Sequence, residues 1–251
     1  MPERYIAVLE LVKRKGTVAV EEIASTFGIS ESTARRDLAF LASRNLLRRI
    51  HGGAVSSERN GHVLPFNARL EQDHDEKLRI ARAAAGFVKP GMQIAVDGGT
   101  TTSMLVPFIL HVDRLTVITN SLQTASELTA NDNIKVFALG GEVDAVSLST
   151  SGSWTTSQLE DVRVDVAFLG VAGVHTEAGL SSGLFEQVHT KRSLIARANR
   201  TIVLADHTKI GQTSLFVVTP LSAVSSIITG VETPEDEAAQ IASCGPKVLR
   251  A

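Results

Sequence analysis

The chain has 251 residues, of which 43% are hydrophobic and 21% charged, a composition typical of a protein that folds around a buried core. This length favours a small domain joined to a larger one. No apolar run is long enough to span a bilayer, and the first residues lack the apolar core of a signal peptide. The single cysteine, Cys244, excludes an internal disulfide and a zinc site built from cysteines. We therefore expect a cytoplasmic protein with no membrane partner.

The net charge of −2 hides an asymmetry along the chain. Residues 1–60 contain 10 Lys and Arg against 7 Asp and Glu, whereas residues 61–251 contain 15 against 20. A basic head on an acidic body is typical of a DNA-binding module attached to a domain with another task. The excess of three positive charges is small, so the motifs of the head must decide what it does.

Apolar residues recur at helical spacing in three consecutive segments near the start of the chain, residues 5–12, 20–27 and 34–41. Gly28 ends the second helix, and the hydroxyl of Ser30 can accept a hydrogen bond from the free amides of the third. A short helix, a glycine turn and a second helix form the helix-turn-helix arrangement, whose second helix enters the major groove of DNA.

A β-hairpin follows these helices at residues 46–55, with its turn at Gly52-Gly53, and it predicts the wing of a winged helix-turn-helix. Arginine suits both elements because its planar fork can pair with guanine or with phosphate oxygens. The alternative is a plain three-helix bundle with solvated arginines, which the capped turn and the basic hairpin disfavour. The side chains expected to contact DNA are Ser30, Ser32, Thr33, Arg35, Arg36, Arg48, Arg49 and His51.

The segment from Val20 to Ala54 resembles the DeoR family of bacterial transcription regulators. Two elements carry the resemblance, Arg-Arg-Asp-Leu at 35–38 and His-Gly-Gly-Ala at 51–54. One departure is Ala19, where a serine that caps the second helix is usual, and this change should cost some helix stability. The resemblance implies a winged helix-turn-helix DNA-binding domain over residues 1–56.

Residues 57–69 are polar, contain glycine and proline and show no period, so they are interpreted as a linker to a domain over residues 70–251. That domain begins with a predicted helix over 70–88. Apolar strands and helices then alternate, which predicts a mostly parallel sheet covered on both faces. The expected strands are 93–97, 115–119, 135–139, 164–169 and 201–205, the expected helices are 102–111, 122–130 and 186–198, and 216–218 and 226–229 are candidates to extend the sheet.

Ligands of such sheets bind beyond the carboxyl ends of the strands, where this chain places glycines and hydroxyl side chains. The first strand runs into Asp97-Gly98-Gly99-Thr100-Thr101-Thr102. Glycines let the backbone approach an anion and threonine hydroxyls donate to it, which suits a phosphate. The loop has neither the lysine of a Walker loop nor the GxGxxG pattern of dinucleotide sites, so no cofactor is expected.

The DeoR resemblance continues through this domain and covers nearly the whole chain, carried by Asp-x-Gly-Thr-Thr, Thr-Asn-Ser, Leu-Gly-Gly-Glu and Leu-Ala-Asp-x-x-Lys-x-Gly. It implies an α/β effector domain similar in fold to ribose-5-phosphate isomerase and glucosamine-6-phosphate deaminase, which senses phosphorylated sugars. The effector-site residues implied by the resemblance are Asp97, Gly99, Thr100, Thr101, Asn120, Gly140, Glu186, Lys191, Asp206 and Lys209.

Two departures from the family pattern concern this effector site. Gly98 replaces a more usual serine and so removes a hydroxyl donor, and the segment 179–185 is individual to this protein. We expect that segment to tune which effector fits.

The chain is therefore expected to be a repressor of a carbohydrate-metabolism operon, released from double-stranded operator DNA by a phosphorylated sugar or related metabolite. Helix-turn-helix proteins read repeated half-sites, so a homo-oligomer, a dimer or a tetramer, is expected. The alternative is an active sugar-phosphate isomerase or deaminase with a DNA-binding head. In the isomerases one strand end is rich in aspartates, whereas the equivalent residues 170–174 contain no carboxylate, so no catalytic residue and no metal ligand is expected.

Three further features are expected to be structural. Asp73, Asp75 and Glu76 suit the solvated start of a helix, favourably placed for its dipole. His207, like the other histidines, shows no metal-ligand spacing and is expected at the surface or in a turn. Trp154 is expected to pack a helix against the domain, with an interface role as the alternative.

Overall fold

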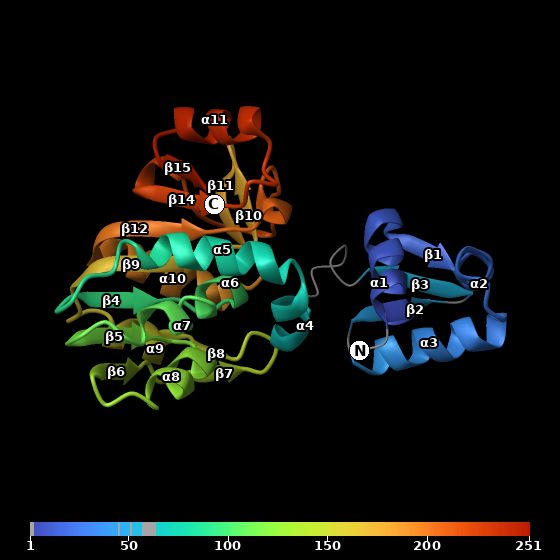
Figure 1. Cartoon of the computed structure of the whole chain (residues 1–251), viewed down its shortest axis with the longest axis horizontal. Coiled ribbons are helices and arrows are strands. Elements are labelled where there is room, and N and C mark those ends of the chain that lie inside the picture. Colours follow the sequence, from blue (N-terminus) through green and yellow to red (C-terminus); the bar gives the residue numbers. More distant parts are fainter. Residues whose placement is uncertain (1–2, 45, 51, 57–63) are drawn as a thin grey trace. The chain divides into compact units, whose positions relative to one another are not determined.

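The computed structural model describes residues 3–44, 46–50, 52–56 and 64–251. The chain divides into two compact units, Met1–Arg69 and Leu70–Ala251, which are described separately (Figure 1). No helix in these described ranges combines the length and apolar character that a membrane crossing requires.

The first unit contains the three helices predicted from the sequence, α1 (Glu3–Lys15), α2 (Val20–Phe27) and α3 (Glu31–Ser43). Their apolar faces meet in one core, to which each helix contributes residues that are at most 5% exposed. Burial of these side chains removes apolar surface from water, which stabilises the unit. The members of this core on α1, α2 and α3 include Val8, Leu11, Val12, Val20, Ile23, Ala34, Leu38 and Leu41.

The predicted hairpin is present as β2 (Leu47–Ile50) and β3 (Gly53–Ser56), but it belongs to a three-stranded antiparallel sheet. The third strand, β1 (Thr17–Ala19), pairs with the other side of β3 and was not predicted, because three residues are too few to show a period. Gly53 permits this pairing, since a Cβ on it would lie 2.2 Å from the carbonyl oxygen of Val18. A glycine in the hairpin therefore serves the packing of the wing as well as its turn.

A helix, α4 (Phe66–Glu71), occupies part of the segment interpreted as a linker. Pro65 precedes it, and the carbonyl oxygen of Pro65 accepts from the amide of Arg69. The side chain of Phe66 is only 2% exposed, so this end of the segment is packed. The linker prediction over 57–69 is thus wrong for 66–69, while 57–63 lie outside the described residues.

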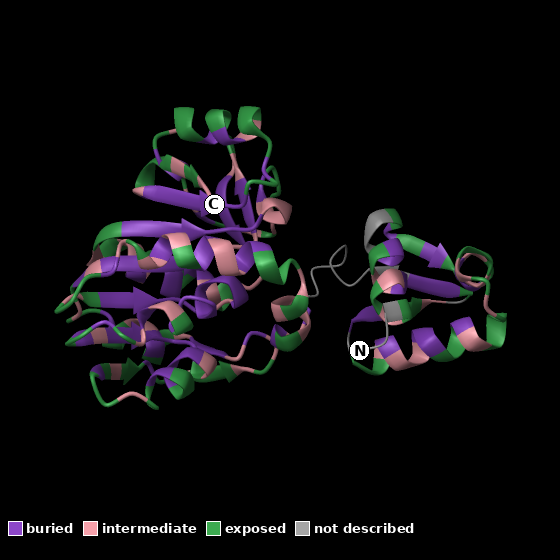
Figure 2. Cartoon of the chain, viewed as in Figure 1, coloured by how far each residue is buried: buried purple, intermediate pink, exposed green. Residues whose placement is uncertain are grey.

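The second unit is built on a seven-stranded sheet in which every neighbouring pair is parallel, as predicted. Side chains alternate between two buried faces, so that Ala95 packs into one core and Ile94 and Val96 into the other. The central strands of the sheet are mostly buried (purple in Figure 2). The strands in spatial order are β15 (Lys247–Arg250), β14 (Ser226–Thr229), β12 (Ala198–Leu204), β9 (Val164–Gly170), β4 (Gln93–Val96), β5 (Leu115–Thr119) and β6 (Ile134–Ala138).

Helices cover both faces of this sheet. One core receives side chains from α5 (His74–Ala85), α7 (Val106–Ile109) and α8 (Leu122–Leu128). The opposite core receives them from α10 (Phe185–Arg197), from α11 (Glu235–Ser243) and from Leu159, which follows α9 (Ser153–Gln158). The shorter elements are α6 (Thr100–Ser103), β7 (Glu142–Asp144), β8 (Ser149–Ser151), and the 3-10 turns η2 (His207–Lys209) and η3 (Leu221–Ala223).

Two predicted helices are each split in the structure. The helix expected over 70–88 is α4 followed by α5, with a break at Asp73, whose φ of 47° is left-handed. The helix expected over 102–111 is α6 followed by α7, because Pro107 has no amide hydrogen to bond the preceding turn.

The strand candidate 216–218 does not extend the main sheet. It forms β13 (Phe216–Thr219), which pairs antiparallel with β11 (Gly179–Ser182) in a separate sheet with β10 (Gly173–His175). All four residues of β11 are buried although two are serines, so its sequence shows no alternation that could predict the pairing. The segment 179–185 is thus a structural element that connects directly to α10.

Candidate functional site

The head presents a capped helix with a polar N-terminal face. Ser30 has extended backbone angles, and its hydroxyl accepts a hydrogen bond from the amide of Thr33 at 3.2 Å. Gly28 ends α2 with a φ of 61° in the left-handed region. The conformation of the turn between α2 and α3 therefore depends on Gly28 and Ser30, the two residues predicted from the sequence to form it.

The side chains expected to contact DNA lie on the outer face of α3 and on β2. Ser32, Arg35 and Arg36 are exposed, and Arg35 donates to Glu31 one turn earlier at 2.8 Å. Arg36 makes no hydrogen bond or ion pair with any described residue, so its fork is available to a ligand. Arg49 is exposed on the wing, whereas the side chain of Arg48 and the whole of His51 lie outside the described residues.

Asp37 is a residue of this helix that the sequence analysis left without a role. It is 2% exposed, and its carboxylate accepts from the guanidinium of Arg4 at 2.7 and 3.2 Å. The hydrogen bond and the charge of Asp37 raise the pKa of Arg4. This bidentate pair joins α1 to α3 and leaves the neighbouring Arg35 and Arg36 to face outward.

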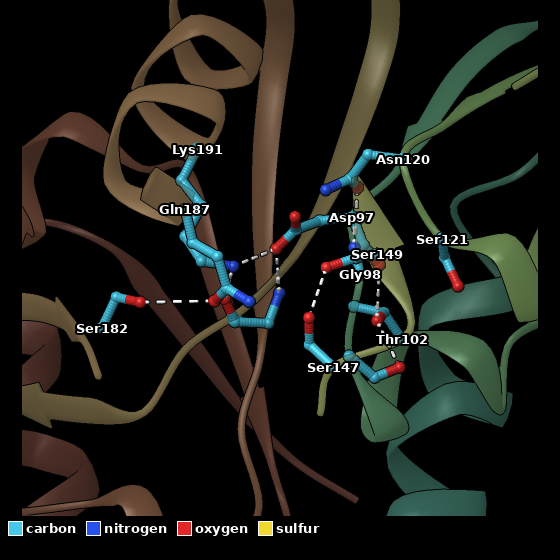
Figure 3. Close-up of polar contacts among 12 residues, drawn as sticks. Asp97, Gly98, Thr102, Asn120, Ser121, Ser147, Ser149, Ser182, Gln187 and Lys191 are labelled. Carbon is cyan, nitrogen blue, oxygen red and sulfur yellow. Dashed lines mark hydrogen bonds and ion pairs between the residues drawn. The ribbon is translucent and has the colours of Figure 1, made fainter. Parts of the chain in front are cut away.

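In the second unit, a buried ion pair lies where β4 and β9 end. The ammonium group of Lys191 on α10 contacts the carboxylate of Asp97 and donates to the carbonyl oxygen of Gly170 at 2.8 Å (Figure 3). The amide of Gly170 donates to the same carboxylate at 3.2 Å. Asp97 and Lys191 are 2% and 3% exposed, so each charge depends on the other for its stability in the fold.

Asn120 fixes the loop that follows Asp97. Its amide oxygen accepts from the backbone amide of Gly98 at 2.9 Å, and its amide nitrogen donates to the carbonyl oxygen of Thr150 at 3.0 Å. Thr102 closes the same loop by donating to the carbonyl oxygen of Asp97 at 2.8 Å. Three strand ends, those of β4, β5 and β9, are thus tied into one polar cluster.

Two threonines of this loop have hydroxyl groups without a hydrogen-bond partner among the described residues. Thr100 and Thr101 are 5% and 7% exposed, and neither hydroxyl bonds to a residue in the described part of the chain. Among the described residues, the fully buried hydroxyls that lack a partner are those of Thr124 and Thr190, so the hydroxyls of Thr100 and Thr101 reach solvent, where a ligand can contact them.

Four of the residues implied by the resemblance do not join this cluster. Glu186 is exposed and lies on the opposite side of α10 from Lys191. Gly140 is held by the side chains of Gln158 and Thr155, which bond its amide at 3.1 Å and its carbonyl oxygen at 2.8 Å.

Asp206 and Lys209 lie beyond β12, on the side of the sheet that α5 covers. Side chains alternate along β12, so Asp206 follows Leu204 toward α5, whereas Asp97 follows Ala95 toward α10. Burial raises the pKa of the Asp206 carboxyl, but the charge of Lys209 and the hydrogen bond from Thr208 outweigh it and hold this pKa below its ordinary value.

The cluster also contains residues that the sequence analysis missed. Gln187 lies one turn before Lys191 on the same face of α10, and Ser182 donates to its side-chain oxygen at 3.4 Å. Ser147 and Ser149 share a hydrogen bond of 2.7 Å beside Gly98. The i,i+4 spacing from Lys191 could have revealed Gln187, whereas the two serines carry no signal in the sequence.

The close approach of Ser149 explains why position 98 is a glycine. A Cβ at this position would lie 2.6 Å from the Cβ of Ser149, so a serine here would force β8 away from the loop. The departure from the family pattern therefore changes the shape of the cluster in addition to removing a hydroxyl group.

One group of side chains has the composition of a metal site. Ligand atoms of Asp73, Glu76 and His207 lie within 4.8 Å of one another. Glu76 accepts from the amide of His207 at 2.7 Å, and its other oxygen lies 2.6 Å from the ring Nδ1. Two ligands at about 2.0–2.1 Å from one ion lie farther apart than 2.6 Å, so this contact is a hydrogen bond. The expectation of a solvated Glu76 is wrong, because the side chain is 3% exposed.

Comparisons with known proteins agree with both halves of the chain. Residues 4–60 match the model of the DeoR-like helix-turn-helix domain, and residues 72–231 match that of the DeoR C terminal sensor domain. The chain is 30% identical over 232 residues to the glycerol-3-phosphate regulon repressor of Escherichia coli (strain K12), which covers 92% of each chain. It is 33% identical over 227 residues to the HTH-type transcriptional repressor GlcR of Bacillus subtilis (strain 168), which covers 90% of this chain and 87% of the other.

Among solved structures, ribose 5-phosphate isomerase A from Methanocaldococcus jannaschii aligns with 55% of each chain at a TM-score of 0.41 and 21% identity. The family matches carry the assignment, because the sensor model alone spans more than half of the residues. The chain belongs to the DeoR family of helix-turn-helix transcription regulators.

Proposed function

We propose that this chain represses a carbohydrate-metabolism operon and leaves its operator when a phosphorylated sugar or a related metabolite binds the second unit. The relatives that support this proposal are repressors, and one is the repressor of a glycerol-3-phosphate regulon. Operator binding requires that the chain share a compartment with the chromosome, so a cytoplasmic location is part of the proposal.

The DNA-reading surface in this proposal is the exposed face of α3 together with the wing. Arg36 carries an unpaired guanidinium, and Ser32 and Arg35 are exposed beside it. Arginine can bond guanine in the major groove or phosphate oxygens on its edge. Arg49 on β2 suits a phosphate contact, because wing residues lie beside the backbone of the duplex. Ser30, Thr33, Arg48 and His51 complete the proposed surface.

The effector site in this proposal is the polar cluster at the ends of β4, β5 and β9. The observation that carries it is the pair of unused hydroxyl groups on Thr100 and Thr101 beside the buried Asp97–Lys191 ion pair. Hydroxyl donors suit the phosphate of a ligand, and Lys191, Gln187 and Asn120 suit its sugar hydroxyls. Gly99 lets the ligand approach the backbone, whereas Gly140, Glu186, Asp206 and Lys209 lie outside this set.

Effector binding then changes operator affinity through the arrangement of two or more heads. Coupling between two such sites is typically worth about 1–3 kcal/mol, which is about 5- to 150-fold in affinity. Reading of repeated half-sites requires a homo-oligomer, a dimer or a tetramer.

A thermal-shift screen of the purified chain against sugar phosphates tests the sensor half of the proposal, since a ligand that binds only the folded state raises the melting temperature. Each ligand that does so is then tested for release of the chain from the DNA upstream of its own gene. Thr100→Val and Thr101→Val should abolish the melting shift and the release while leaving operator binding intact. Thr213→Val, which removes an exposed hydroxyl elsewhere, is the matched control.

Two outcomes would overturn the proposal. If the chain bound no fragment of the upstream region in a sequence-specific way, the operator function would be contradicted. Turnover of ribose 5-phosphate or of a hexosamine phosphate by the purified chain would show that the second unit is an enzyme.

A further inference from the structure

The helix that reads DNA in the proposed function carries a carboxylate on its exposed face. Of the two acidic residues of α3, Asp37 is buried and bound by Arg4, whereas the side chain of Glu31 is 47% exposed. Glu31 begins the helix, at the end that meets base edges in helix-turn-helix proteins. A negative charge at this place repels the phosphates of every duplex alike. Glu31 therefore lowers the affinity for DNA unless its carboxylate bonds a base.

Glu31 forms an ion pair with Arg35, one turn later on the same face of α3. Nη2 of Arg35 donates to Oε2 of Glu31 at 2.8 Å, and the Arg35 side chain is 59% exposed. A guanidinium has five N–H donors, so this contact leaves one edge of the fork available. No other described residue bonds either charged group. An exposed pair at this spacing adds little to stability, so the fold does not depend on it.

The hydroxyl groups beside this pair already bond one another. Oγ of Ser30 lies 2.8 Å from the hydroxyl oxygens of both Ser32 and Thr33, and it also accepts from the amide of Thr33. These bonds stabilise the start of the helix and reduce what the three hydroxyls can offer to a base. Base contacts at this end of α3 therefore depend chiefly on its charged side chains.

A guanidinium beside a carboxylate is the complement of one particular base pair in the major groove. Guanine presents two adjacent acceptors, N7 and O6, and its partner cytosine presents the amino donor N4. O6 and N4 are hydrogen-bonded to each other, about 2.9 Å apart, which matches the 2.8 Å between Arg35 and Glu31. In an A·T pair the amino group lies between the two acceptors, so no fork can take both and reach a donor beside them.

We propose that Glu31 and Arg35 read one G·C base pair as a unit, with the guanidinium on N7 and O6 of guanine and the carboxylate on N4 of cytosine. Glu31 is thereby a specificity-determining residue that the sequence analysis did not identify. The inference rests on the proposed function and deepens it, because it names a base pair that the operator must contain. The ion pair also holds the guanidinium in place before DNA binds, so less side-chain freedom is lost on binding.

Base analogues test these contacts atom by atom. The probe is a labelled fragment of the DNA upstream of the gene, with each base pair replaced in turn, and its fluorescence anisotropy with the full chain at fixed salt gives the affinity. One G·C pair in each half-site should lose about tenfold in affinity when it is reversed or replaced by A·T. The only tryptophan cannot report this binding, because Trp154 lies in the sensor unit, where it is 77% exposed rather than packed against the domain as expected.

At the same pair, N4-methylcytosine removes the exposed amino hydrogen and 7-deazaguanine removes N7, while both analogues still form the base pair. Each should weaken binding of the wild-type chain severalfold. Glu31→Ala should bind the N4-methylcytosine and cytosine duplexes equally, and Arg35→Ala should be indifferent to 7-deazaguanine. Loss of the analogue's effect in one variant alone assigns the contact to that side chain.

Glu31→Ala should also bind an unrelated duplex more tightly, because it removes a charge that repels phosphates. The ratio of specific to unrelated affinity should fall by about tenfold. A purely structural role of Glu31 would instead lower the affinity for every duplex together. Glu10→Ala is the matched control, since it removes an equal charge from an exposed position on α1 and should leave the base preference unchanged. Unchanged far-ultraviolet circular dichroism should show that each variant is folded.

The inference fails if Glu31→Ala keeps the full penalty at N4-methylcytosine, or if no G·C pair of the bound fragment depends on both Glu31 and Arg35. Equal effects of Glu10→Ala and Glu31→Ala would also overturn it, since loss of one charge would then suffice. All these results require a chain that binds its fragment specifically, so they leave the proposed function intact. Failure of the proposed function is a different result, the absence of specific binding to any upstream fragment, and it would overturn this inference as well.

Discussion

The head and the sensor unit place their functional side chains in opposite ways. In the head, Arg35 and Arg36 are exposed, project from a single helix and take no part in the core. In the sensor unit, Asp97 and Lys191 are buried, come from segments 94 residues apart and hold two strands and a helix together. Loss of an arginine in the head should therefore leave its fold intact, whereas loss of Asp97 or Lys191 should also destabilise the sensor unit.

This difference follows from what each surface must bind. Duplex DNA is a large polyanion that arginines reach from a convex surface, and much of the binding is electrostatic. A small metabolite must be enclosed, so its site consists of groups already withdrawn from water. The same kind of substitution should therefore change binding in one region and stability in the other.

The largest effect is expected from Lys191→Met. It leaves the carboxylate of Asp97 buried without its partner, a change that typically costs about 3–5 kcal/mol. Urea unfolding followed by the fluorescence of Trp154, which lies in the sensor unit, measures this loss.

The double variant Asp97→Asn with Lys191→Met is the matched control, because it removes both charges. It should lose less free energy of unfolding than the two single variants lose together. A single variant that costs less than about 1 kcal/mol would mean that water reaches the pair, contrary to its burial.

Substitutions on the exposed face of the head should change its affinity for DNA rather than its stability. Arg36→Ala removes an exposed, unpaired guanidinium, so operator affinity should fall by about 1–3 kcal/mol while the free energy of unfolding changes by less than about 0.5 kcal/mol. Arg35→Ala should act in the same direction. Gel shifts with operator and with an unrelated duplex, at fixed salt, measure the loss and show whether it is specific.

Arg44→Ala is the control for this prediction. Arg44 follows the other end of α3, where its guanidinium lies 4.8 Å from the centre of the Phe40 ring. Its removal should leave operator affinity nearly unchanged. Equal losses for Arg36 and Arg44 would indicate a general effect of charge and would contradict a reading face at the start of α3.

The two regions also differ in how well the sequence predicts them. The helices of the head show their period, and Gly28 and Ser30 mark the turn, because the conformation of each depends on near neighbours. Six of the seven strands of the parallel sheet are also evident as short apolar runs, whereas the edge strand β15, in which Lys247 and Arg250 flank two apolar residues, was not predicted. Local signals thus predict the elements and the exposed face of α3.

The partners of buried polar groups were harder to predict. Asp97 and Lys191 were both identified, but nothing in the sequence indicates that they pair or that Gln187 lies beside them. Glu76 was expected in solvent, since its neighbours Asp73 and Asp75 suit a helix start. Its burial depends on His207, 131 residues later in the chain, and such a contact depends on topology.

A smaller effect is expected at the helix caps, where two substitutions should act in opposite directions. Ser30→Ala removes the hydroxyl that accepts from Thr33 and should destabilise the head by about 1 kcal/mol. Ala19 has the extended backbone of a cap residue but no side-chain bond, so Ala19→Ser should stabilise the head by up to a similar amount. Thermal unfolding of the head measures both, and a stabilising Ser30→Ala would contradict the cap.

The smallest effect is expected from the pH dependence of the sensor unit. Burial lowers the pKa of His207, but the hydrogen bond to Glu76 and the charges of Glu76, Asp73 and Asp206 outweigh it, so this pKa lies above its ordinary value. The folded state therefore binds a proton more tightly than the unfolded chain. This stability is fully present below about pH 6.5, the ordinary pKa of histidine, and is lost as the pH rises through the raised value.

Because the His207 side chain is 38% exposed, the contribution should be at most about 1 kcal/mol. Glu232 is another charged group near the pair, and although burial raises the pKa of its carboxyl, the hydrogen bond from Arg79 outweighs this and holds that pKa below its ordinary value. His207→Gln should therefore flatten the fall in unfolding free energy between about pH 6.5 and 8. His111→Gln, which changes an exposed histidine elsewhere, should leave that fall unchanged. A wild-type curve that rises over this interval would mean that His207 is neutral in the folded state and that Glu76 is held by the backbone amide alone.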